Sequence, residues 1–129
     1  MVVASALAEK HKRLERVFLN EAVSKEGIYG LNLYTLGVPH TVIVDDFLPV
    51  KLSVSADKKQ LYYATLFSHI SDDGSLWGAI LEKAFAKVYG NYQHLVSGDP
   101  RDAARALNGS PSTLFSHKSS SNTVDMMWR

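Results

Sequence analysis

The chain has 129 residues, of which 46% are hydrophobic and 21% are charged, a composition typical of one globular domain with its own core. Its 14 basic and 13 acidic residues nearly balance, so the net charge of +1 gives no general attraction for nucleic acid or an acidic membrane surface. The count of zero cysteines excludes disulfides, thiolate metal sites and a cysteine nucleophile within these residues.

The sequence also lacks the signals of a membrane or secreted protein. No apolar run approaches the roughly 20 residues of a membrane-spanning helix. The start of the chain is faintly amphipathic, but Glu9 and Glu15 do not suit a transit peptide. We therefore expect an intracellular protein, either cytoplasmic or organellar, that neither inserts into a membrane nor binds nucleic acid.

The first predicted element is an amphipathic helix over residues 4–22. Its apolar residues recur at helical spacing on one side, namely Leu7, Leu14, Phe18 and Ala22. Gly27 is expected to end this segment, because glycine suits the position that follows a helix.

An antiparallel hairpin is predicted next, over about residues 28–47. Tyr29, Leu31 and Leu33 alternate with other residues, which is typical of a strand with one buried face. The stretch "TVIVDDFL" is rich in β-branched residues and predicts the second strand. The turn is expected at residues 37–40 ("GVPH"). Pro49, which has no amide donor, should close the second strand or lie at its edge.

The next stretches predict one strand and one long helix. "KLSVSADKKQ" (51–60) is interpreted as a loop with a short extended piece, and "LYYATLF" (61–67) as a third strand. A helix is predicted over about residues 75–89, capped by Ser75 or Asp73 and ended by Gly90. Its apolar stripe comprises Trp77, Leu81, Ala84, Phe85 and Val88.

The end of the chain predicts a short helix and a tail. Asp99 and Pro100 are expected to open the helix "RDAARAL", since proline suits the first helical position. Residues 110–129 are serine-rich and have no hydrophobic period, so we expect a flexible or partner-ordered tail. Four apolar residues near its end form a candidate interface, namely Val124, Met126, Met127 and Trp128.

Two adjacent acids, Asp45 and Asp46, raise the question of catalytic or metal-binding carboxylates. Neighbouring residues on a strand point to opposite faces, so these two do not share one pocket. We expect one carboxylate to point outward. The other should accept hydrogen bonds from loop amides at the strand end or pair with a lysine.

The remaining candidate groups are isolated from one another. Five histidines are scattered along the chain, and no pair has metal-ligand spacing on a helix (His11, His40, His69, His94 and His117). "SDDGS" (71–75) lacks the acid pattern of a calcium loop and is interpreted as a capping turn. Glu82 and Lys83 are interpreted as part of a solvated helix face. The residues alone therefore predict an α+β domain with no visible active site and no cofactor.

Two stretches, in this order, resemble the calpain family. "GIYGLNLYTLGVPHTVIVDDFLP" is similar, without gaps, to the calpain pattern of Gly-Ile-aromatic, an apolar strand, Gly, and Val-x-Val-Asp-Asp-x-Leu-Pro. "LWGAILEKAFAKVYGNYQHLVSGDP" resembles the calpain helix of Phe-Trp-x-x-Leu-Leu-Glu-Lys-Ala-Tyr-Ala-Lys with the Gly-x-Tyr and Leu-x-x-Gly that follow it. The resemblance covers about residues 27–109. The residues that carry it are Asp45, Asp46, Pro49, Trp77, Glu82, Lys83, Gly90 and Tyr92.

The resemblance implies an α+β fold that forms part of the first lobe of a papain-like cysteine protease core. It divides the chain into an N-terminal helix (1–26), a protease-core segment (27–109) and an extended tail (110–129). The "VDDFLP" stretch then corresponds to a structural corner. In calpains this region lies between the segment with the nucleophilic cysteine and the lobe with the histidine and asparagine.

The family's functional residues do not carry over to this chain. There is no cysteine, no Gly-His-Ala-Tyr motif and no Asn-Pro-Trp motif. The glutamate that calpains place before Phe-Trp as a calcium ligand is also absent, since Ser75 and Leu76 precede Trp77. The resemblance thus implies no catalytic residue, no metal site and no cofactor here.

Two functions are compatible with these observations. The first is a non-catalytic, calpain-like (pseudoprotease) module that acts as a structural or interaction subunit of a larger assembly, with other protein subunits as its partners. The alternative is a fragment of a calcium-dependent calpain-type cysteine endopeptidase whose Cys, His and Asn segments lie outside this chain. Binding of a peptide or small molecule in a remnant cleft is a third hypothesis, which no residue supports.

Overall fold

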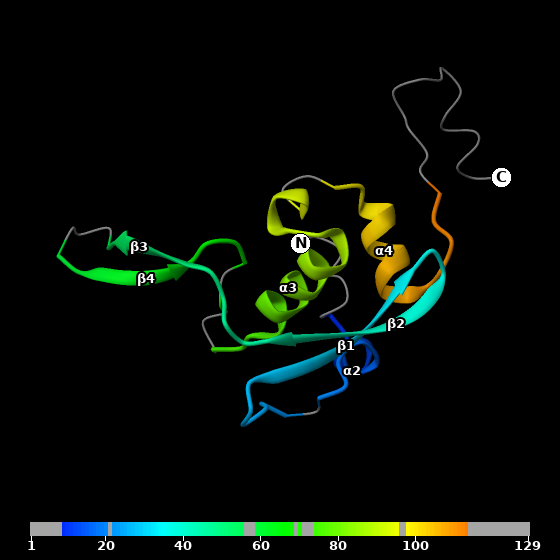
Figure 1. The fold of residues 1–129 in the computed structure, drawn as a ribbon, viewed down its shortest axis with the longest axis horizontal. Helices are drawn as coiled ribbons and strands as arrows, with labels where there is room; N and C mark the ends of the chain where they lie inside the picture. The colour runs from blue at the N-terminus through cyan, green and yellow to red at the C-terminus, as the bar shows by residue number, and fades with distance from the viewer. Residues whose placement is uncertain are drawn as a thin grey trace, which may run out of the picture.

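A computed structural model of the chain describes residues 9–20, 22–55, 59–68, 70, 74–95 and 98–113. These residues adopt an α+β fold with two antiparallel two-stranded sheets, which confirms the predicted fold class (Figure 1). The elements in chain order are α2 (His11–Val17), β1 (Ile28–Thr35), β2 (Val38–Asp45), β3 (Val50–Val54), β4 (Leu61–Thr65), α3 (Trp77–Tyr89), the 3-10 helix η1 (Tyr92–Leu95) and α4 (Pro100–Asn108).

The N-terminal helix is shorter than predicted. Part of the predicted range lies outside the described residues, and within them α2 ends at Val17. Phe18 forms an isolated antiparallel bridge with Leu31, and the Leu19 amide donates to the Gly30 carbonyl at 2.9 Å. The expected continuation to residue 22 is therefore wrong, because the chain pairs with the outer edge of β1 instead. Gly27 does not end a helix either; it lies in the turn that leads into β1, with φ of 66°.

The predicted hairpin is confirmed, with Ile28 paired to Asp45 and Thr35 paired to Val38. Its inner face is buried, as the alternation predicted, and comprises Tyr29, Leu31, Leu33, Val42 and Val44.

The turn of this hairpin is not at residues 37–40, because Val38 to His40 belong to β2. The turn consists of Leu36 and Gly37, whose φ angles of 52° and 81° fit the two-residue turn that matches strand twist. Proline is tolerated within β2 because Pro39 faces the outer edge. The backbone N–H and C=O of Gly30 bond to Asn20 and Leu19 and not to its β2 partner Ile43. The backbone groups of Ile43 therefore face the outer edge of β2, and the same holds for every second residue along the strand, including Pro39.

Helix α3 supplies the largest part of the core that packs on this sheet. Ile80 and Leu81 are each only 1% exposed, and Ala84 is fully buried. Trp77 and Phe85 are half-buried against this core, whereas Val88 is exposed, so the predicted stripe is right for its centre and wrong at Val88.

The start of α3 also differs from the prediction. The helix begins at Trp77, and its N-cap position is Leu76, with no side-chain cap. Ser75 is therefore not the cap, and Asp73 lies outside the described residues.

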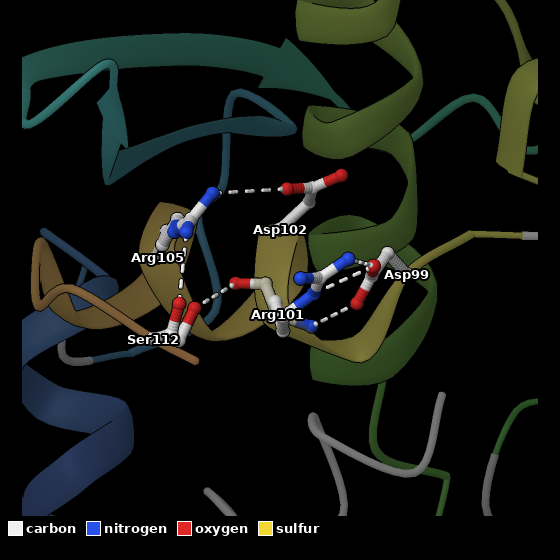
Figure 2. A network of polar contacts seen from close by, with 5 residues as sticks. All are labelled: Asp99, Arg101, Asp102, Arg105 and Ser112. Atoms are coloured by element: carbon white, nitrogen blue, oxygen red, sulfur yellow. Dashed lines mark hydrogen bonds and ion pairs between the residues drawn. The ribbon is translucent and has the colours of Figure 1, made fainter. Parts of the chain in front are cut away.

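Helix α4 confirms the predicted capping. The Asp99 side chain accepts a hydrogen bond from the Arg101 amide at 2.9 Å, and Pro100 occupies the first helical position. Figure 2 shows that the same helix binds the following segment, since Ser112 Oγ donates to the Arg101 carbonyl and Arg105 donates to the Ser112 carbonyl at 2.8 Å. The beginning of the predicted tail is thus tied to α4. Residues 114–129, with Val124, Met126, Met127 and Trp128, lie outside the described residues.

The second hairpin was only partly predicted. The range 51–60 was interpreted as a loop with a short extended piece; that piece is β3 (Val50–Val54), which pairs with the predicted third strand β4 to form a hairpin that was not predicted. Figure 1 shows this ribbon extending away from the helices and from β1–β2. Among the described residues, no helix is long and apolar enough to cross a bilayer.

Candidate functional site at the end of β2

The corner at the end of β2 gathers most of the residues that the sequence singled out. Asp45 is the last residue of β2, and its carboxylate accepts a hydrogen bond from the Phe47 amide at 2.9 Å. It also forms an ion pair with Lys83 of α3. The Lys83 hydrogen bond, followed by that of the Phe47 amide, lowers the pKa of the Asp45 carboxyl. This matches the expected contacts with a loop amide and a lysine.

The second carboxylate of the pair points elsewhere. The Asp46 amide donates to the Gly27 carbonyl at 3.0 Å, and the Asp46 carboxylate lies over Gly27, where an added Cβ would be 2.7 Å from Oδ1. Asp45 and Asp46 thus have separate surroundings, as the strand geometry predicted. Pro49 does not close β2. It precedes β3, and its carbonyl accepts from the Leu66 amide at 2.8 Å, at the base of the ribbon.

Glu82 and Lys83 are not a solvated helix face. The Glu82 carboxylate accepts a hydrogen bond from the Ser68 amide at 2.7 Å, just after β4. The Lys83 side chain is only 19% exposed, and its ammonium group also donates to the Phe47 carbonyl at 2.6 Å. Two adjacent helix residues thus hold the two loops that flank the β3–β4 ribbon.

Lys87 and Phe67 complete the corner and were missed from the sequence. Lys87 Nζ donates to the Ile43 carbonyl at 2.7 Å, on the outer edge of β2. Its position four residues after Lys83 puts both lysines on one side of α3, which is the signal that could have indicated a shared role. Phe67 stacks on Tyr92, with ring centroids 4.4 Å apart.

Gly90 and Tyr92 shape the end of α3. Gly90 adopts a φ of 100° and ends the helix, as predicted. The Tyr92 hydroxyl is buried with no hydrogen-bond partner among the described residues. Burial, followed by the nearby carboxylates of Glu82 and Asp45, raises the pKa of this hydroxyl.

An open groove lies beside this corner, between the β2 edge and α3. Its volume is about 580 Å³, and Ile28, Ile43, Ala86 and Lys87 are among the residues that line it. Lys83, which also lines the groove, bonds to Asp45 of β2 and to the Phe47 carbonyl of the loop after it, and Lys87 bonds to the Ile43 carbonyl of β2. Within the described ranges, no three His, Asp or Glu side chains are grouped as metal ligands.

The three histidines in the described part of the chain form no hydrogen bond or ion pair with Asp45, Glu82 or Lys83. His11 lies on α2, His40 on β2 and His94 on η1. His69 and His117 lie outside the described residues. A cysteine-protease mechanism needs a thiolate, a base and an orienting group within hydrogen-bond reach, and the 129 residues contain no cysteine. The chain as given is therefore not catalytic by that mechanism, and the corner is an arrangement of packing and hydrogen-bonding residues.

Comparison with known proteins places the chain among relatives of much greater length. The sequence profile of the calpain family cysteine proteases matches residues 1–129, a wider range than the predicted 27–109. The chain is 36% identical over 83 residues to "Calpain-5" of Caenorhabditis elegans, covering 64% of this chain and 11% of that protein. It is 35% identical over 83 residues to "Calpain-1 catalytic subunit" of Homo sapiens, covering 64% of this chain and 10% of that protein.

A plant relative matches more of the chain. The "Calpain-type cysteine protease ADL1" of Oryza sativa subsp. japonica is 28% identical over 127 residues, covering 95% of this chain and 5% of that protein. The chain thus spans between 5% and 11% of the length of these relatives. With the whole-chain profile match, these findings identify the chain as a member of the calpain family of cysteine proteases.

Proposed function

We propose that this chain is a non-catalytic calpain-like module that acts as a structural or interaction subunit of a larger protein assembly. The observation that carries the proposal is the role of the residues that resemble the calpain pattern. Asp45, Glu82 and Lys83 all hold strand ends and loops in place, while the chain has no cysteine to supply a nucleophile.

The exposed apolar surface supports the interaction part of the proposal. Several large apolar side chains at and beyond the corner are more than half exposed, among them Phe47 at 83% and Tyr63 at 78%. Contiguous apolar patches of more than a few hundred Å² are typical of interaction sites. We expect neighbouring subunits to cover this surface, and we expect Val124, Met126, Met127 and Trp128 to contact such a neighbour.

One observation favours the alternative function. The chain spans only 5% to 11% of the length of the relatives described above. If it is part of a complete calpain, the catalytic residues lie in segments outside this chain. In that case the corner would support one lobe of a cysteine endopeptidase.

The proposal predicts no peptidase activity, which an assay of the purified chain tests. Incubation with a casein-type substrate, with and without calcium, should give no cleavage above a protein-free control. A ligand that binds the folded state raises the melting temperature, and no calcium site is predicted in this chain. Calcium should therefore leave the melting temperature unchanged. Cleavage that a thiol-directed inhibitor blocks would contradict the proposal.

The size of the native assembly tests the subunit role. In a detergent-free extract, the chain should elute well above 28.6 kDa, which is twice its mass of 14.3 kDa. Elution as a folded monomer would contradict a role in a larger assembly.

A further inference from the structure

The ribbon formed by β3 and β4 has one apolar face and one mixed face. Cross-strand partners lie on the same face of a sheet, and residues alternate between faces along each strand. The pairing of Leu52 with Tyr63 and of Val54 with Leu61 therefore gathers apolar side chains on one side. Each of these is more than half exposed, and the apolar residues of this face are Val50, Leu52, Val54, Leu61 and Tyr63. The same face ends at Thr65, the partner of Val50, which is only 9% exposed. The opposite face carries Lys51, Ser53, Tyr62 and Ala64.

The outer edge of β3 offers backbone groups for strand pairing. The Leu66 amide donates to the Pro49 carbonyl and the Ser55 amide to the Gln60 carbonyl, each at 2.8 Å, so these two pairs are hydrogen-bonded. Hydrogen-bonded pairs alternate along an antiparallel ladder. Val50, Leu52 and Val54 consequently direct their N–H and C=O groups away from β4. No hydrogen bond within the described part of the chain engages these outward groups.

The outer edge of β2, by contrast, is protected. On β2, Pro39 removes a donor from the outer edge, and Lys87 binds the Ile43 carbonyl. Proline and lysine are the residues by which natural sheets prevent edge-to-edge pairing. β3 contains no proline, its single lysine is Lys51, whose backbone groups face β4, and the positions whose backbone groups face outward carry only valine and leucine. An edge with unpaired outward backbone groups at apolar positions is a template for a further strand.

The sequence of β3 suits a second copy of itself. In "VKLSV" the apolar and polar residues alternate in the same order when the strand is followed from either end. An antiparallel pair of β3 strands about a two-fold axis at Leu52 therefore places Val50 opposite Val54. Lys51 then faces Ser53 of the other copy, and no two like charges are opposed. The outward groups of Val50, Leu52 and Val54 meet the outward groups of the same residues in the second copy, which allows about six hydrogen bonds.

Pairing through β4 is less suitable. A two-fold axis at Tyr63 would place Leu61 opposite Thr65, which is only 9% exposed where the ribbon joins the rest of the fold. A second strand there would meet the body of the chain.

We propose that two copies of this chain pair through β3, antiparallel about Leu52, to form a four-stranded sheet in the order β4–β3–β3–β4. Two-stranded hairpins are marginally stable in water, whereas sheets of three or more strands with an apolar face are stable, so pairing stabilises the ribbon. The dimer also joins the two apolar faces into one surface. This inference concerns the isolated chain and does not depend on the proposed subunit function.

A single introduced cysteine tests the register, because the chain has none of its own. In the proposed pair the two Leu52 Cα atoms lie roughly 5.5 Å apart, within the range of a disulfide. Leu52→Cys should therefore form a disulfide dimer under mild oxidation. Tyr63→Cys on the same face is the matched control, since three strand spacings separate its copies by roughly 14 Å. Equal cross-linking of the two variants, or none at Leu52, would refute the register.

A proline at position 52 tests whether the dimer forms through the outer edge of β3. Light scattering of the unmodified chain during size exclusion should give a dimer. Leu52→Pro removes an outward N–H without touching the bonds to β4, and it should weaken the dimer at least about tenfold. Leu61→Pro removes an outward N–H on β4 and should leave the dimer intact. A monomeric or open-ended polydisperse chain would overturn the proposal, as would equal effects of the two prolines with folding preserved by circular dichroism.

Discussion

The ammonium group of Lys83 on α3 forms an ion pair with the Asp45 carboxylate at the end of β2, and it donates to the Phe47 carbonyl at 2.6 Å. One side chain thus joins a helix to both the strand and the loop that leads towards β3. The two partners are 38 residues apart in sequence. Their contact is a tertiary link that fixes the direction in which the chain leaves the first sheet.

Lys83→Met should lower the melting temperature. Methionine keeps the length of the stem, but the Asp45 carboxylate and the Phe47 carbonyl lose their shared donor. Asp45→Asn in the Lys83→Met background should have little further effect, because both changes remove the same ion pair. Lys87→Met is the matched control and should have a smaller effect, since Lys87 binds a single carbonyl. Additive losses in the double variant would show that the pair does not act as a unit.

Lowering the pH should destabilise α4 over a pH range that is set by the pKa of Asp99. Its pKa is lowered to about 2, first by the side-chain hydrogen bond from Arg101 and then by the Arg101 amide. A carboxyl whose folded pKa lies below its unfolded value of about 3.9 contributes stability above that value. This contribution is lost as the pH falls from about 4 to about 2.

Denaturant unfolding between pH 6 and pH 2 measures this dependence. Asp99→Asn should reduce the loss of stability in that window. Asp102→Asn is the control, since its carboxylate lies 3.6 Å from Arg105 on the exposed side of the same helix and should leave the Asp99 contribution in place (Figure 2). If Asp99→Asn lost as much stability between pH 6 and pH 2 as the unmodified chain, the Asp99 N-cap would not be the cause of that loss.

Leu81→Ala should cost about 2–5 kcal/mol in the free energy of unfolding, because it leaves a cavity at a side chain that is 1% exposed. Val88→Ala on the same helix changes an exposed side chain and should stay within about 0.5 kcal/mol. Urea unfolding of both variants makes the comparison. Similar losses at the two positions would mean that α3 presents a different face to the core.

Gly109→Ala should destabilise the protein more than Gly37→Ala. Both glycines have a positive φ, of 65° and 81°, so alanine strains the backbone at either position. Only at Gly109 would the new Cβ also meet a ring, 2.7 Å from Cδ1 of Tyr34. Thermal unfolding should therefore give the lower midpoint for Gly109→Ala. The opposite order would show that Tyr34 moves aside at no cost.

The sequence predicted the elements whose signals are local. The alternation in β1, the β-branched run in β2 and the Asp99–Pro100 cap each lie within a few residues, and each corresponds to an observed element. β3 was predicted only as a short extended piece of a loop, because its alternation is short and its pairing with β4 is not visible in the local sequence. The turn was misplaced because Pro39 was interpreted as a turn residue, whereas the outer edge of β2 accepts it. The roles of Glu82 and Lys83 depend on partners 14 and 36 to 38 residues away, which no periodicity indicates.

The polypeptide that carries these residues is either a non-catalytic module or a segment of a protease. Mass spectrometry of the denatured polypeptide, isolated from its native source with an antibody against the described region, tests this directly. The proposed function predicts a polypeptide in which the cysteine, histidine and asparagine motifs of the family are all absent. A polypeptide of calpain length that contains a cysteine, a histidine and an asparagine in the family's motifs would contradict it.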